Sequence, residues 1–221
     1  MPKKPASKAA KTNKPAKVPV HGPQHSNQVR IIGGAWKRTP LPVLSASGLR
    51  PTPDRVRETV FNWINHQRDG NWADAQVLDL FAGSGALGFE AASRGAQSVT
   101  MIDTVVPVVR QLEDIKAKLK AENVQIMRAD ALAVAQSAAM RGQKYDLIFL
   151  DPPYQQEFLE RCLPLCTRIL KEGGLIYAES GLALEFEEGD APEWMAPWEV
   201  LRADKAGMVF YHLLKHKQTA A

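Results

Sequence analysis

A glycine loop carries the first chemical signal in this sequence, because Gly83, Gly85 and Gly88 match the pattern G-x-G-x-x-G. Glycines at this spacing permit a tight turn and bring backbone amides close to a ligand beside a helix N-terminus. Asp103 follows Gly83 by 20 residues, and a carboxylate there can accept hydrogen bonds from both ribose hydroxyls. The loop predicts a site for an adenosine-bearing cofactor. The alternative is a glycine turn that only packs a helix closely against a strand.

Two further acids bear on which cofactor this is. Asp79 ends the apolar run before the loop, where a carboxylate would repel the pyrophosphate of a dinucleotide but attract the sulfonium and ammonium groups of S-adenosylmethionine (SAM). Its simpler role is to cap the amides of the glycine loop. Asp130 and Ala131 follow a later apolar run; they could bind adenine through the carboxylate and the next N–H, or Asp130 could only cap a helix.

The tetrapeptide Asp151-Pro152-Pro153-Tyr154 follows an apolar run over residues 145–150. Proline has no N–H, so this loop offers hydrogen-bond acceptors, and Asp151 adds a carboxylate. Two acceptors that hold the hydrogens of an exocyclic amino group favour a pyramidal nitrogen whose lone pair points at an incoming methyl group. Tyr154 offers a face on which an extruded base can stack. The tetrapeptide predicts methyl transfer to a nucleobase amine; the alternative is a strand-ending turn with a buried tyrosine.

Strands and helices alternate from residue 76 onward, which predicts an α/β fold with a mostly parallel sheet covered on both faces by helices. The predicted strands cover residues 76–80, 98–102, 124–127, 145–150 and 174–179, and the predicted helices cover residues 86–93, 105–120, 130–140 and 156–170. Two final strands over residues 198–202 and 208–214 predict a hairpin that completes a seven-stranded sheet. The glycine loop and the tetrapeptide both follow strands, so they meet at the carboxyl edge, where ligands bind in open α/β sheets.

Three regions are predicted along the chain: a disordered Lys/Pro-rich tail over residues 1–27, an extension over residues 28–52 and the methyltransferase-like domain over residues 53–217. The extension contains two short apolar runs that predict a small β-hairpin. After it, Thr52 is expected to cap a helix whose first residue is Pro53, with Asp54 favourable at the positive helix end.

Charge is distributed unevenly along the chain. Ten basic residues precede the first acidic residue, Asp54, and the rest of the chain has 18 basic and 24 acidic residues. A basic front predicts a polyanion partner, and the alternative is a solvated tail. Candidate phosphate contacts are Arg50, Arg55 and Arg57; the alternative for them is salt bridges with Asp54 and Glu58.

Composition excludes several protein classes. Two cysteines cannot form a disulfide framework or a four-ligand zinc site, and Cys162 and Cys166 are expected to be core thiols. The spacing of His212 and His216 assigns no metal, because one falls on a predicted strand and the other on a tail. The sequence shows neither an apolar run long enough to span a membrane nor a secretory signal. We expect a monomeric, cytoplasmic protein without a membrane partner.

Together these motifs resemble the RsmD family, bacterial enzymes of the SAM-dependent amino-methyltransferase class that methylate a guanine 2-amino group in 16S ribosomal RNA of the small subunit. The resemblance rests on the segments Arg30–Gly34, Arg50–Asn62, Leu78–Gly88 and Ser93–Ala96, on Asp103 and on Asp151–Tyr154. The segment over residues 50–62 points to the family, whereas the glycine loop and the tetrapeptide point to the class. Asp103 stands where many relatives carry Glu, and Lys37-Arg38-Thr39 replaces the usual Arg-Gly-Arg run.

The resemblance implies a Rossmann-like class I methyltransferase fold and a role for each matching residue. The implied SAM-binding residues are Asp79, Phe81, Gly83, Gly85, Asp103, Asp130 and Ala131. The implied catalytic residues at the target guanine are Asp151, Pro152 and Tyr154. The implied RNA-facing residues are Arg30, Lys37, Arg38, Arg50, Thr52, Arg55 and Arg57, and the implied partner is ribosomal RNA in the small ribosomal subunit or an assembly intermediate.

Three rival functions share part of this evidence. An adenine-N6 methyltransferase uses the same tetrapeptide and differs in the substrate base. A nicotinamide-dependent oxidoreductase shares the glycine loop but has no need of Asp-Pro-Pro-Tyr. A non-catalytic RNA-binding module explains the basic front but not the acids at three strand ends.

Overall fold

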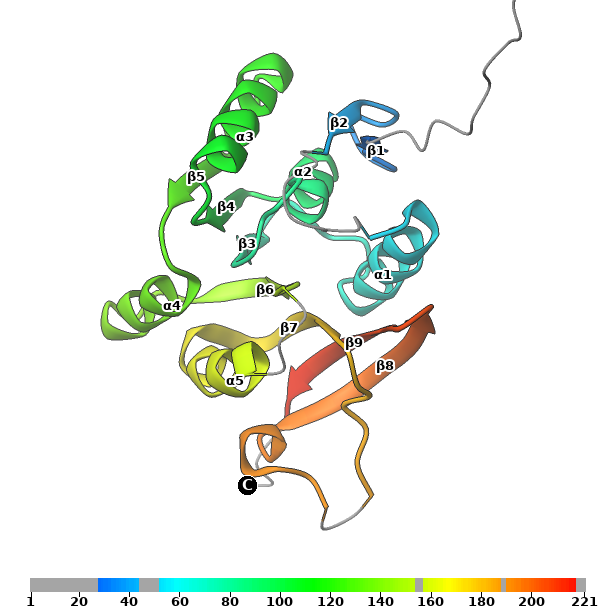
Figure 1. The fold of residues 1–221 in the computed structure, drawn as a ribbon, viewed down its shortest axis with the longest axis vertical. Coiled ribbons are helices and arrows are strands. Elements are labelled where there is room, and N and C mark those ends of the chain that lie inside the picture. The colour runs from blue at the N-terminus through cyan, green and yellow to red at the C-terminus, as the bar shows by residue number, and fades with distance from the viewer. Residues whose placement is uncertain (1–27, 44–51, 154–156, 188–189, 218–221) are drawn as a thin grey trace, which may run out of the picture.

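The computed structural model describes residues 28–43, 52–153, 157–187 and 190–217, which form a twisted sheet flanked by helices and a small hairpin (Figure 1). The hairpin strands are β1 (Gln28–Arg30) and β2 (Pro40–Pro42). The strands of the main sheet are β3 (Gln76–Asp79), β4 (Ser98–Asp103), β5 (Val124–Arg128), β6 (Tyr145–Leu150), β7 (Leu170–Ser180), β8 (Trp198–Ala206) and β9 (Val209–His216). The helices are α1 (Asp54–Gln67), α2 (Ala86–Ser93), α3 (Val106–Leu119), α4 (Ala131–Met140), α5 (Glu157–Ile169) and the 3₁₀ helix Glu193–Met195.

The seven-stranded sheet has the order β5-β4-β3-β6-β7-β9-β8. Neighbouring strands from β5 to β7 are parallel, and β9 lies antiparallel between β7 and β8. The predicted alternation and C-terminal hairpin are confirmed. The prediction that the fifth strand of the sheet starts at residue 174 is wrong, because β7 begins at Leu170. The strand continues through Gly173 and Gly174, where its register with β6 shifts between Tyr145 and Leu147.

Strand side chains alternate between two apolar cores, one on each face of the sheet. One core joins the sheet to α1, α2, α3 and the N-terminal hairpin, and the other joins it to α4 and α5 (Figure 1). Cys162 and Cys166 are fully buried in the second core, as predicted, and burial raises the pKa of both thiols. None of the helices within the described ranges has the length and apolar character needed to cross a membrane.

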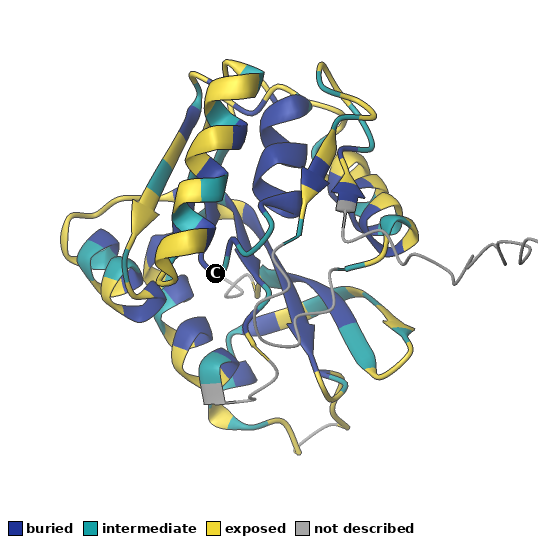
Figure 2. Cartoon of the chain, turned by 45° about the horizontal axis from the view of Figure 1, so that its top comes forward, coloured by how far each residue is buried: buried dark blue, intermediate teal, exposed yellow. Residues whose placement is uncertain are grey.

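The hairpin packs onto α2, which is buried along its whole length (Figure 2). The buried Glu90 carboxylate accepts hydrogen bonds from the backbone N–H of Ile32 (2.6 Å) and Gly33 (2.9 Å), and it pairs with Arg94 at 2.8 Å. The Ser93 hydroxyl donates to the Gly33 carbonyl at 2.6 Å and accepts from the Trp36 N–H at 2.9 Å. These bonds fix the hairpin to the domain.

Arg57 provides the third attachment of the hairpin, and the prediction that it contacts RNA is wrong. Its side chain is fully buried, donates to the Arg30 carbonyl at 2.9 Å and pairs with Asp54 at 2.6 Å. Burial lowers the pKa of Arg57, and Asp54 opposes this effect. The alternative of a salt bridge with Asp54 is confirmed, but the pair lies beneath the hairpin rather than on an open helix surface.

The predicted start of α1 also needs correction. Pro53 occupies the N-cap position and Asp54 is the first helical residue, and no side-chain hydrogen bond caps this helix. The Thr52 hydroxyl instead donates to the Glu179 carboxylate at 2.8 Å. A hydroxyl hydrogen bond to a carboxylate is stronger than one between two neutral groups, which favours this contact over a helix cap.

We expect Glu90→Ala to lower the free energy of unfolding by about 3 kcal/mol, because it leaves two backbone N–H groups and a partly buried guanidinium without their acceptor. Urea unfolding measures this, with Glu113→Ala on the exposed face of α3 as the control. Equal unfolding midpoints for the two variants would show that Glu90 does not hold the hairpin.

Candidate functional site

The candidate site lies at the carboxyl edge of the sheet, around the end of β3. The strand order reverses there, because β4 lies on one side of β3 and β6 lies on the other. The strands β3, β4 and β6 end at or directly before Asp79, Asp103 and Asp151. In open α/β sheets a crevice forms outside such a reversal of strand order, and ligands bind there. The sheet therefore brings these acids together, as the sequence predicts.

The three glycines of the loop have different roles. A Cβ atom on Gly85 would lie 2.6 Å from the Phe89 ring, and one on Gly88 would lie 2.8 Å from Met101. Both glycines are therefore needed for close packing, which was the alternative explanation of the motif. Gly83 has φ +49°, and a Cβ atom there would meet nothing within 4 Å. Of the three glycines in the loop, only Gly83 combines a left-handed backbone with open space around its Cβ position, so it is the one that a ligand can approach.

Asp103 shapes this loop with its carboxylate. One oxygen accepts from the Gly83 N–H at 3.1 Å and the other accepts from the Val105 N–H at 2.8 Å. The side chain is partly exposed, and each carboxylate oxygen has further lone pairs for a ribose hydroxyl. Asp103 thus fixes the position of the Gly83 backbone, and its carboxylate oxygens can still accept further hydrogen bonds at the crevice.

Asp79 is the least compensated acid in the structure. It is 1% exposed, its Oδ1 accepts from the Phe81 N–H at 3.3 Å, and its buried Oδ2 has no hydrogen-bond partner. Burial raises the pKa of Asp79 to about 7, while hydrogen bonds from the Phe81 and Gly88 amides oppose this rise. An orphaned carboxylate oxygen beside an open glycine fits a ligand that carries positive charge and does not fit a pyrophosphate.

Asp130 is the N-cap of α4, and its carboxylate accepts from the Ala133 N–H at 2.9 Å. The helix-cap interpretation is therefore confirmed, and adenine binding by Asp130 and Ala131 stays a prediction. Phe81 is half-buried and packs edge-on against Phe158, with ring centroids 5.5 Å apart. Its ring sits between the glycine loop and α5, on the same edge of the sheet.

A second acid, which sequence reasoning missed, stands beside Asp151. Leu150 pairs with Ala178 across β6 and β7, so Asp151 lies next to Glu179 at the strand ends. The Glu179 Oε1 atom accepts from the Tyr177 hydroxyl at 2.6 Å and from the Thr52 hydroxyl at 2.8 Å. The sequence does hold a signal for Glu179: it is an acid at the end of a predicted apolar strand, like Asp79 and Asp103.

The protonation of this pair is set by its surroundings. Burial and the nearby carboxylates of Glu179 and Asp79 raise the pKa of Asp151 well above its usual range. Burial also raises the pKa of Glu179, but the hydrogen bonds from Tyr177 and Thr52 oppose that rise. Pro152 is buried behind Asp151 and Pro153 is exposed, whereas Tyr154 lies outside the described residues.

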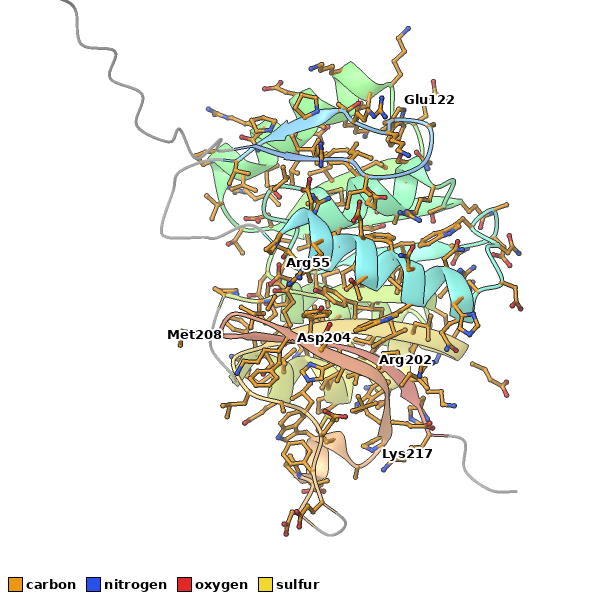
Figure 3. All side chains as sticks on the ribbon, turned by 90° about the vertical axis from the view of Figure 1, so that its right-hand side faces the viewer. Arg55, Glu122, Arg202, Asp204, Met208 and Lys217 are labelled. Atoms are coloured by element: carbon orange, nitrogen blue, oxygen red, sulfur yellow. The ribbon has the colours of Figure 1, made fainter. Side chains whose placement is uncertain are left out.

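The predicted RNA-facing residues lie in several places. Lys37, Arg38 and Arg55 are exposed, and Arg30 is exposed but paired with Asp54 at 2.6 Å. Arg55 projects from the start of α1 toward the hairpin of β8 and β9, which carries Asp204 (Figure 3). Arg50 lies outside the described residues, as does the tail over residues 1–27.

Comparison with known proteins gives consistent matches over nearly the whole chain. A family model described as Conserved hypothetical protein 95 matches residues 29–215. Ribosomal RNA small subunit methyltransferase D of Escherichia coli K12 is 42% identical over 199 residues, which is 88% of this chain and 94% of that protein. The Haemophilus influenzae protein of the same name is 36% identical over 89% of this chain and 98% of its own length.

A solved structure supports the same assignment. The Escherichia coli protein yhhF superimposes with a TM-score of 0.72 at 42% identity, covering 86% of this chain and 98% of that one. The family resemblance that the motifs indicate is therefore confirmed over most of the chain. The chain belongs to the RsmD family, which the model Conserved hypothetical protein 95 describes.

Proposed function

We propose that this chain is a SAM-dependent methyltransferase that methylates the exocyclic 2-amino group of a guanine in small-subunit (16S) ribosomal RNA. The observation that carries the proposal is the pairing of two kinds of acid at one edge of the sheet. Asp79 has an orphaned oxygen suited to a cationic donor, and Asp151 begins the acceptor-only proline loop. The names of relatives at 42% and 36% identity support ribosomal RNA of the small subunit as the substrate.

The residues present fit SAM better than a dinucleotide. Gly83 and Asp103 would hold the adenosine part, Asp130, Ala131 and Phe81 would border it, and Asp79 would face the positively charged end. When bound, SAM supplies a methyl group whose carbon–sulfur bond breaks, with the electron pair left on sulfur, as a carbon–nitrogen bond forms. This arrangement argues against the rival oxidoreductase, because the buried Asp79 carboxylate would lie where a pyrophosphate must sit.

Asp151 and the proline loop would act on the target base. The Asp151 carboxyl would accept a hydrogen bond from the amino group and hold its nitrogen toward the donor. The nitrogen gains positive charge as it is methylated, and a carboxyl at that position stabilises this charge and can accept the released proton. Burial of Pro152 keeps the loop rigid, so the acceptors are in place before the base arrives.

RNA would be held mainly by the exposed cations of the hairpin, Lys37 and Arg38, with Arg55 at the start of α1. We expect Arg30 to contribute less than these residues, because Asp54 already pairs with it. The substrate would be ribosomal RNA within the small subunit or an assembly intermediate, and the enzyme would act as a cytoplasmic monomer.

Incubation of the protein with tritiated SAM and total RNA from undermethylated cells tests the function directly. We expect the label in small-subunit ribosomal RNA, and digestion to nucleosides should place it on guanine as 2-methylguanosine. Label on adenine N6 would support the rival methyltransferase, and absence of label from assembled subunits and naked RNA alike would contradict the proposal.

We expect Asp151→Ala to reduce methyl transfer by at least about 100-fold, because the amino group loses the acceptor that orients it and receives its proton. SAM binding, measured by calorimetry, should be nearly unchanged. Asp114→Ala on the exposed face of α3 is the matched control. Loss of SAM affinity with preserved turnover would contradict the assigned role of Asp151.

We expect SAM affinity to rise as pH increases through about 7. Burial raises the pKa of Asp79 to about 7, so below that pH the side chain is neutral and no longer attracts the sulfonium. Asp79→Asn should weaken binding by about 30-fold, corresponding to about 2 kcal/mol, and should flatten the pH dependence. Calorimetry across pH 6 to 8, with Asp114→Asn as the control, measures both effects; an unchanged pH dependence in Asp79→Asn would exclude Asp79 as the titrating group.

A further inference from the structure

Glu179 forms a buried polar cluster with Asp151, Tyr177 and Thr52 at the carboxyl edge of the sheet. Glu179 is 8% exposed, at the end of β7, and it bonds to residues from two separate parts of the chain. A buried acid costs free energy that an apolar residue of similar volume would avoid. Its place at the carboxyl edge of the sheet, beside the tetrapeptide, points to a role in the reaction.

The geometry of the cluster brings one carboxyl group against the other. The register of β6 and β7 pairs Leu150 with Ala178, so the next residues, Asp151 and Glu179, are neighbours across the strand pair. Their side chains are close enough for a direct hydrogen bond. Two carboxyl groups in such contact hold one proton between them, because both cannot ionise in a desolvated site.

Two hydroxyl donors decide which member of the pair is ionised. Tyr177 and Thr52 both donate to Oε1 of Glu179, at 2.6 Å and 2.8 Å. Hydrogen bonds to a carboxylate favour its charged form. Glu179 is therefore the carboxylate of the pair, and Asp151 carries the shared proton on the oxygen that faces Glu179.

We propose that Glu179 is a positioning residue that shares one proton with Asp151. The second Asp151 oxygen is then free to accept a hydrogen bond from the target amino group. The pair can also take up the proton that this nitrogen releases when it is methylated. This inference rests on the proposed function. As the nitrogen gives its proton to the free Asp151 oxygen, the shared proton moves from Asp151 to Glu179. The pair changes from one negative charge to none, and the proton later passes to solvent.

Other ionisable groups around the pair bear on the sign of the pH effect. Asp79 on β3 and Tyr211 on β9 flank the pair, and Tyr177 and Thr52 donate to it. Asp79 adds negative charge, which favours the proton on the pair, whereas the two hydroxyl donors favour the singly charged form. In the wild-type protein, activity is lost on the acid side only when the pair takes a second proton.

Glu179→Gln tests the inference through the pH dependence of single-turnover methyl transfer. In Glu179→Gln the Asp151 carboxyl no longer has a carboxylate with which to share a proton, so it takes up its proton at higher pH than the pair takes up its second proton. We expect the acid side of the profile to move to higher pH by about one unit or more. Tyr177→Phe and Thr52→Val should move it less, in the same direction, because each removes one donor to Glu179.

Tyr211→Phe is the matched control for Tyr177→Phe. This substitution also removes a hydroxyl that donates to a carboxylate, because the Tyr211 hydroxyl donates to Asp204 at 2.7 Å. Asp204, however, is not a member of the Asp151–Glu179 pair. The pH profile of Tyr211→Phe should match that of the wild type. A uniform fall in rate in Glu179→Gln, with the profile unmoved, would overturn the inference and assign Glu179 a structural role.

Infrared spectroscopy of the full chain without donor or RNA gives a readout that does not depend on turnover. At about pH 9, where Asp79 with its pKa of about 7 is ionised, we expect a protonated-carboxyl band that is lost in Asp151→Asn and in Glu179→Gln but kept in Tyr211→Phe. Absence of this band in the wild type would overturn the shared proton even if the enzyme methylates RNA. Conversely, presence of the band in a protein that methylates no RNA would contradict the proposed function and leave the proton sharing intact.

Discussion

The organisation of this site follows from the cost of burying negative charge. Three acids, Asp79, Asp151 and Glu179, lie at one edge of the sheet where little water reaches them, and carboxylates in such a place must find positive charge, hydrogen-bond donors or a proton. Each acid meets this requirement differently. The buried Asp79 Oδ2 atom has no hydrogen-bond partner of its own, Glu179 accepts from two hydroxyl donors, and in our proposal Asp151 shares a proton with Glu179.

These solutions divide the site by chemistry. The β3 side has an unsatisfied acceptor and an open glycine, and it suits a positively charged donor molecule. The β6 side has a proline-fixed loop and a carboxyl pair, and it suits an amine that must be oriented and then lose a proton. Because both sides lie at the ends of adjacent strands, the sheet itself sets the distance between them.

Local sequence signals predicted the parts of this molecule that depend on neighbouring residues. The strands, most helix boundaries and the acids at strand ends follow from periodicity and from glycine and proline positions. The errors share one cause, which is contact between distant segments. The Thr52 hydroxyl donates a hydrogen bond to Glu179, which lies 127 residues later in the chain. Arg57 is buried beneath the N-terminal hairpin, which precedes it in the sequence. Glu179 itself depends on the register of β6 and β7, which no local pattern specifies. In hindsight Arg57 lies four residues before Phe61 and seven before Ile64, on the buried face of α1.

The attachment of the first hairpin to α2 has a consequence for how the chain is made. The backbone of Gly33 finds its acceptor, Glu90, 57 residues later. During synthesis from the N-terminus the hairpin emerges first and has no partner until α2 follows, while the buried Glu90 carboxylate of α2 lacks its backbone donors until the hairpin docks. The two segments must therefore become ordered in one event. Exchange of the hairpin between relatives should therefore succeed only when α2 is exchanged with it.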